Sequence, residues 1–182
     1  MRLFAALPVE GAARDELGRN LAQLRRRDWP VRWVREEGLH VTIKFFGEVG
    51  EPEGIIGLLR EASAGAPVQP LAPVGLGVFP NPSRARIVWA GYQGEPSLEL
   101  LVHRVERGAV ALGFPVEGRP FRPHVTLGRV RDGSRLPAEA AALLEEMPLT
   151  DGFSVDRLLL LSSRTGPGGA TYSEVASIPL GA

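Results

Sequence analysis

The tripeptide His-Val-Thr occurs twice in this chain, and each copy opens an apolar stretch. The first stretch begins at His40-Val41-Thr42 and the second at His124-Val125-Thr126. Successive side chains of a β-strand point to opposite faces, so a histidine and a threonine two positions apart lie on the same face. The repeat therefore predicts two strands of similar construction, each presenting one imidazole beside one hydroxyl.

Helical and strand-like patterns alternate along the rest of the chain. Apolar residues three or four apart predict helices over 10–27 and 137–147, with two more beginning at Pro52 and Pro96. Because several neighbouring strands are joined by short turns, we expect antiparallel sheet and an α+β fold. Runs rich in β-branched and aromatic residues predict strands over 2–7, 31–34, 40–46 (ended by Gly47), 70–79, 84–90, 124–130, 153–161 and 171–179.

The two His-Thr strands occupy equivalent places in this order, since each precedes a predicted helix. This suggests two similar lobes related by a rough two-fold axis, with the histidines facing a shared cleft. We therefore expect residues 1–182 to form a single bilobal domain, in which two pseudo-symmetric antiparallel sheets flanked by helices enclose a central active-site cleft.

Composition narrows the classes of partner. The chain carries 21 lysines and arginines against 21 acidic residues, which argues against non-specific binding of long nucleic acid but allows a small site for one phosphate. It has no cysteine, which excludes disulfides, thiolate metal ligands and a cysteine nucleophile. The apolar start at 2–7 is too short for a signal peptide, and no run approaches the roughly 20 residues of a membrane span. We expect a cytoplasmic protein that does not engage a membrane.

The paired residues suit acid–base chemistry on a phosphate. A histidine titrates near pH 6.5, so of two histidines flanking one phosphate, one can accept a proton while the other donates one. Each such transfer contributes roughly 10²–10⁴ in rate. The hydroxyls of Thr42 and Thr126 could donate hydrogen bonds to the charged phosphate oxygens. This chemistry needs no metal and no cofactor, and the sequence holds no metal-binding spacing of histidines.

The sequence around both motifs resembles a known family. Residues 39–49 (LHVTIKFFGEV) and 121–129 (FRPHVTLGR) resemble the two signature motifs of the two-histidine phosphoesterases, most closely those of the RNA 2′,3′-cyclic phosphodiesterases, also called 2′-5′ RNA ligases. Segments 2–7, 33–35, 86–89 and 161–172 are also similar to the family, so the resemblance covers nearly the whole chain.

This resemblance implies a bilobal fold and the metal-independent hydrolysis of 2′,3′-cyclic phosphate ends of RNA to 2′-phosphates. It makes His40 and His124 the catalytic pair, with His40 favoured as acid and His124 as base. The same groups could run the reverse reaction and form a 2′-5′ linkage without ATP. The implied partners are RNA ends, tRNA fragments among them, and we expect a monomer.

Further residues could contact the substrate. Lys44 shares the strand parity of His40 and Thr42, which would bring its charge to the cleft. Arg129 has the wrong parity, and it would reach the cleft only through a bulge near Gly128.

Two alternatives stay open at this point. The same chemistry could act on a small cyclic nucleotide or an ADP-ribose derivative, or the protein could bind RNA ends without turnover.

Overall fold

The structure is a computed structural model that describes residues 1–166 and 169–181. Pro167 and Gly168, in the glycine-rich stretch before the last strand, lie outside the described residues. In chain order the elements are β1 (Arg2–Pro8), α1 (Gly11–Arg25), β2 (Val31–Trp33), η1 (Glu36–Gly38), β3 (His40–Glu48), α2 (Glu53–Ser63), β4 (Gln69–Phe79), η2 (Pro82–Arg84), β5 (Ile87–Gly94), α3 (Pro96–Ala111), β6 (His124–Val130), α4 (Ala140–Glu146), β7 (Phe153–Val155), β8 (Arg157–Gly166) and β9 (Gly169–Pro179).

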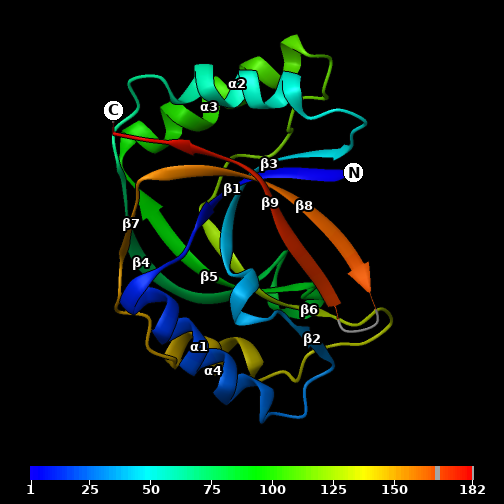
Figure 1. The fold of residues 1–182 in the computed structure, drawn as a ribbon. Helices are drawn as coiled ribbons and strands as arrows, with labels where there is room; N and C mark the ends of the chain where they lie inside the picture. Colours follow the sequence, from blue (N-terminus) through cyan, green and yellow to red (C-terminus); the bar gives the residue numbers. More distant parts are fainter. Residues whose placement is uncertain (167–168, 182) are drawn as a thin grey trace.

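The strands form an antiparallel sheet that curls on itself (Figure 1). Their order is β7-β4-β5-β6-β3-β1-β8-β9, and β2 pairs with β6 beside this path. The two His-Thr strands, β3 and β6, are neighbours at the centre, where Val41 pairs with Val125. The two predicted sheets are therefore the two halves of one curled sheet, and the α+β fold expected from the sequence is confirmed.

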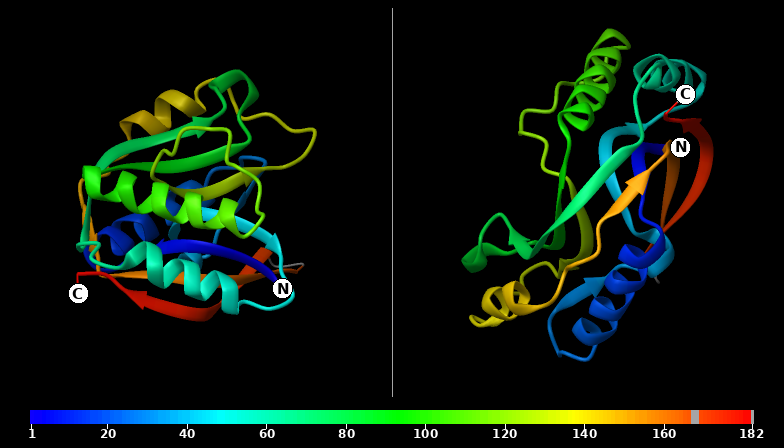
Figure 2. Two further views of the ribbon diagram at one scale, coloured as in Figure 1. Left: turned by 90° about the horizontal axis from the view of Figure 1, so that it is seen from above. Right: turned by 90° about the vertical axis from the view of Figure 1, so that its left-hand side faces the viewer.

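Helices cover the outside of each half. Helices α2 and α3 lie side by side over the half that contains β3, β8 and β9, as both views of Figure 2 show. Helix α4 packs against β4, and α1 against β7, on the other half. Among the described residues, no helix is long and apolar enough to cross a membrane.

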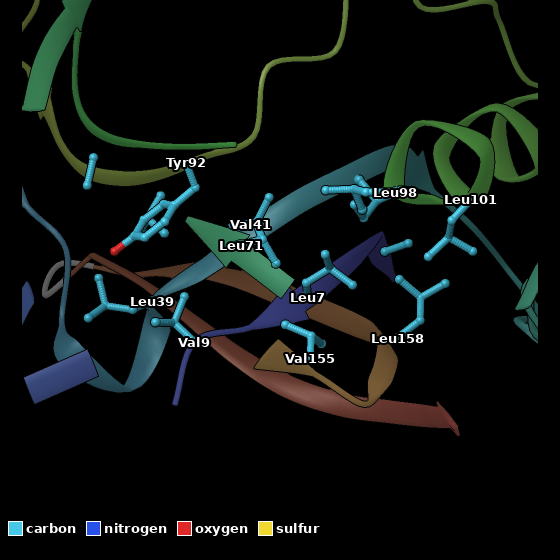
Figure 3. Close-up of a cluster of buried hydrophobic side chains, with 14 of the residues drawn as sticks. Leu7, Val9, Leu39, Val41, Leu71, Tyr92, Leu98, Leu101, Val155 and Leu158 are labelled. Carbon is cyan, nitrogen blue, oxygen red and sulfur yellow. The ribbon is translucent and has the colours of Figure 1, made fainter. Parts of the chain in front are cut away.

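The core lies between the helices and one face of the sheet. From α3, Leu98, Leu101 and Val105 are fully buried, because the apolar residues repeat on one side of the helix. Figure 3 shows Leu98 and Leu101 in one cluster of buried side chains that also includes Leu7 of β1. Each such leucine contributes roughly 1.5–3 kcal/mol to folding through burial. The opposite face of the sheet carries a second, smaller cluster: Phe4, Ala6, Leu159 and Leu161, with Tyr172 packed against it. We call this the site face.

Several element boundaries differ from the prediction, and the three clearest differences are in strands. Strand β3 continues through Gly47 to Glu48, because Gly47 takes a φ of 76° at an irregularity in its pairing with β1. Strand β5 starts at Ile87, since η2 occupies the residues before it and the Asn81 side chain accepts a hydrogen bond from the Arg84 amide. The predicted strand 153–161 is two strands, β7 and β8, separated at Asp156.

Candidate active site

A bulge in β3 decides which of its side chains reach the site face. Ala6 of β1 pairs with Thr42, but the adjacent Ala5 pairs with Lys44, so Ile43 is the extra residue. Paired residues on neighbouring strands point to the same side. Thr42 therefore shares the site face with Ala6, whereas Lys44 points with Ala5 into the core.

The predicted role of Lys44 in binding substrate is wrong for this reason. Its side chain is only 6% exposed. The ammonium donates hydrogen bonds to the Pro115 carbonyl at 2.7 Å and to Glu106 Oε1 at 3.0 Å. Its charge is thus neutralised on the core side of β3, away from the histidines.

A second bulge brings Arg129 to the site face. Thr126 pairs with Trp89 of β5, and Gly128 pairs with the adjacent Val88, so Leu127 is the extra residue in β6. The bulge that Arg129 needs in order to reach the site face is therefore present. Arg129 is exposed and lies on the same side as His124 and Thr126. Gly128 itself faces the core, where a Cβ would lie 2.5 Å from Val31 Cγ1 and 2.7 Å from the ring of Trp33.

The pairing of β3 with β6 brings both motifs together. Because Val41 lies opposite Val125, the antiparallel register sets His40 across from Thr126 and Thr42 across from His124. Diagonal neighbours in such a pair have Cα atoms about 7–8 Å apart, which applies to His40 and His124. The positive charges of His124 and Arg129 both act on His40. The structure thus gathers the predicted histidines, threonines and Arg129 on one face.

Both imidazoles are held in the same way. Nδ1 of His40 lies 2.7 Å from the Gly38 carbonyl, and Nδ1 of His124 lies 2.7 Å from the Arg122 carbonyl. A carbonyl oxygen can only accept, so Nδ1–H is the donor in each bond. In the neutral ring this leaves Nε2 with a free lone pair, and in the charged ring with a proton to give.

The two histidines differ in their surroundings. The His40 ring lies 4.9 Å from the ring of Phe4 and 5.1 Å from that of Tyr172, whereas His124 meets the edge of Phe79 at 5.2 Å. Burial above all, together with the charges of His124 and Arg129, lowers the pKa of His40 to about 4, although the Gly38 carbonyl acts in the opposite direction. His40 is therefore neutral at pH 7.

Comparison with known proteins identifies the family. Residues 13–167 match the family described as the 2′-5′ RNA ligase superfamily. The chain belongs to this superfamily. It is similar to the RNA 2′,3′-cyclic phosphodiesterase of Methanothermobacter thermautotrophicus, with 32% identity over 96% of each chain. It is also similar to that of Aeropyrum pernix, with 35% identity over 84% of this chain and 89% of the relative.

Solved structures show the same fold. A Thermus thermophilus protein superimposes with a TM-score of 0.81 and 25% identity, over 99% of this chain and 98% of that one. Escherichia coli LigT, solved with 3′-AMP, gives a TM-score of 0.76 at 24% identity, over 98% and 97% of the two chains. The curled sheet with its flanking helices is thus the fold of other solved proteins as well.

In this superfamily member, two hollows share Tyr172 in their walls, and His40 lines one of them. One of about 210 Å³ is lined by His40 itself, with Tyr172 and Leu161 among its walls. The other, of about 550 Å³, is lined by Arg25 and Arg35 and shares Tyr172 with the first. The first hollow therefore offers space for a ligand beside His40.

Sequence reasoning missed two sets of contributors to this geometry. The Gly38 and Arg122 carbonyls orient the imidazoles, and the only sequence signal is that each precedes its histidine by two residues. Phe4 and Phe79 touch the histidines from strands distant in sequence, which no local pattern reveals. Tyr172 also contributes, because it contacts His40 and packs against the apolar cluster of the site face.

Proposed function

We propose that this protein hydrolyses 2′,3′-cyclic phosphate ends of RNA to 2′-phosphates by metal-independent acid–base catalysis. The observation that carries the proposal is the pair of His-Thr motifs on adjacent strands, each imidazole tethered through Nδ1 so that Nε2 is available on the same face. The relatives named RNA 2′,3′-cyclic phosphodiesterase support the reaction class.

The proposed reaction uses each group once. The neutral histidine takes a proton from water through Nε2 as the water oxygen attacks phosphorus. The bond between phosphorus and O3′ breaks, and the charged histidine protonates the departing oxygen. The hydroxyls of Thr42 and Thr126 donate to the non-bridging oxygens, and the Arg129 guanidinium offsets the charge that gathers there.

The environment of His40 bears on which histidine is the base. The family resemblance favoured His40 as acid, but its lowered pKa leaves it neutral in the free protein and ready to accept a proton. We therefore assign the base to His40 and the acid to His124 in the hydrolytic direction. A bound phosphate anion would raise the pKa of His40 toward neutrality, where a base works best.

The same geometry would serve ligation. A 5′-hydroxyl in place of water would attack phosphorus, form the P–O5′ bond and release O3′ as a hydroxyl, which yields a 2′-5′ linkage without ATP. We place both reactions on RNA ends such as tRNA fragments, carried out in the cytoplasm by a monomer whose residues 1–182 act as one bilobal domain. The absence of cysteine fits a reducing compartment.

A second candidate is the same reaction on a small cyclic nucleotide or an ADP-ribose derivative. The hollow of about 210 Å³ beside His40 favours it, because pockets for a single small molecule are usually about 300–1,000 Å³, so this hollow has no room for a strand. The zero net charge of the chain is also compatible with a small substrate.

The test is product analysis on an oligonucleotide with a 2′,3′-cyclic phosphate end, with EDTA present. We expect a 2′-phosphate and undiminished turnover. A 3′-phosphate product, or loss of activity in EDTA, would contradict the mechanism. Equal turnover of a cyclic mononucleotide would favour the second candidate, and binding without turnover would reduce the protein to an RNA-end-binding module.

A further inference from the structure

Two arginines face each other across neighbouring strands at the edge of the site. Arg32 of β2 pairs directly with Arg129 of β6. The flanking residues of β2, Val31 and Trp33, pack over Gly128 on the core side. Because side chains alternate along a strand, Arg32 points to the opposite side and shares the site face with Arg129. Both arginines are exposed.

This arrangement is unfavourable unless an anion occupies it. Like charges directly opposite each other destabilise a sheet. The chain has 21 acidic residues that could neutralise the pair, yet within residues 1–166 and 169–181 neither arginine lies in an ion pair with a carboxylate. A phosphate group would supply the missing negative charge and match the planar donors of two guanidinium groups.

The position of the pair relative to the histidines indicates which phosphate it would hold. The Arg129 charge acts on His40, so Arg129 lies near the reacting centre. Arg32 sits one strand further from β5, on the far side of Arg129. Positive charge thus extends from Arg129, near His40, to Arg32, as a strand of RNA leaving the site would require.

We propose that Arg32, with Arg129, binds the phosphodiester that precedes the terminal cyclic phosphate, and that Arg32 thereby selects RNA ends over cyclic mononucleotides. This inference rests on the proposed hydrolysis of 2′,3′-cyclic phosphates. It gives the site a second phosphate position, which a mononucleoside substrate leaves empty.

The experiment compares two substrates, a nucleoside 2′,3′-cyclic phosphate and a dinucleotide with one 3′-5′ phosphodiester and the same cyclic end. For Arg32→Gln we expect kcat/KM to fall about tenfold on the dinucleotide, the size of one charged hydrogen-bonding contact, and to change less than about twofold on the mononucleoside. Arg60→Gln is the matched control, because Arg60 is an exposed arginine of α2, remote from β2. It should change neither value.

A second measurement removes the charge from the substrate instead of from the protein. A dinucleotide whose internal linkage is an uncharged methylphosphonate should lose about tenfold in kcat/KM with the wild-type protein, and Arg32→Gln should add nothing to that loss. Equal effects of Arg32→Gln on both substrates, or none on either, would overturn the inference. Absence of turnover of either substrate by the wild-type protein would instead refute the proposed function.

Discussion

Lys44 and Glu106 form an ion pair between β3 and α3, with Nζ 2.9 Å from Oε2, on the side of β3 opposite to Thr42. Glu106 also accepts a hydrogen bond from the Glu117 amide at 2.8 Å. Although burial alone would raise the pKa of Glu106, these bonds lower it. The pair therefore anchors the segment that leads from α3 to the second His-Thr strand.

Replacing Lys44 tests this structural role. Lys44→Met leaves the Glu106 carboxylate without its cation and the Pro115 carbonyl without its donor, so we expect a loss of about 2–4 kcal/mol in the free energy of unfolding, measured in urea. The double variant Lys44→Met/Glu106→Leu should recover part of it. A loss below about 0.5 kcal/mol would show that the pair does not hold the segment.

The pH dependence of hydrolysis tests the assignment of the base. A base must be deprotonated to act, and the pKa of His40 in the free protein is about 4. The acid limb of kcat/KM, which reports the free protein, should therefore have its midpoint near pH 4. The limb of kcat should lie higher, since bound phosphate favours the imidazolium. A kcat/KM limb near pH 6.5 or above would assign the base elsewhere.

The aromatic neighbours of His40 predict which substitutions shift the acid limb of kcat/KM. Tyr172→Leu removes the ring 5.1 Å from the imidazole and lets water reach it, which weakens the burial that lowers the pKa of His40. The midpoint of the acid limb should move from about pH 4 toward the ordinary histidine value of 6.5. Tyr172→Phe keeps the ring and should leave the midpoint unchanged. An NMR titration of His40 in each variant checks this, and equal pKa values in both would refute it.

The same shift predicts an acid-sensitive fold. The pKa of His40 is about 4 in the folded protein and about 6.5 in the unfolded chain. Between these two pH values the unfolded chain binds more protons, so the free energy of unfolding falls as the pH drops through this window. The His40 contribution to that fall is up to about 3 kcal/mol, and it vanishes above about pH 6.5. His40→Gln should lack it. Urea unfolding of both proteins across this pH window measures the difference, and parallel curves would contradict the prediction.

Local pattern predicted the elements well because apolar periodicity of about 3.6 or 2 residues follows from burying one face of a helix or a strand. It could not predict which face Lys44 and Arg129 occupy. Each position depends on a bulge, at Ile43 or Leu127, and a bulge arises from register with a partner strand distant in sequence. The two bulges have opposite effects: the Lys44 side chain lies on the core side of the sheet, whereas the Arg129 side chain lies on the site face.

The candidate site was predictable only as far as its residues repeat in sequence. His40, Thr42, His124 and Thr126 stood out because the motif occurs twice. Arg32 did not, since its relation to Arg129 exists only through the pairing of β2 with β6. The rings around His40 likewise come from β1 and β9, at the two ends of the chain.

We infer that two imidazoles on adjacent strands share the proton transfers at one phosphorus atom. The most direct measurement is the rate of cyclic-phosphate hydrolysis by His40→Ala, His124→Ala and their double variant, with His103→Ala, an exposed histidine of α3, as control. We expect each single variant to lose at least about 100-fold in kcat, the double variant to lose little more because the pair acts as a unit, and the control to be unchanged. Folded single variants with kcat close to that of the wild type would contradict it.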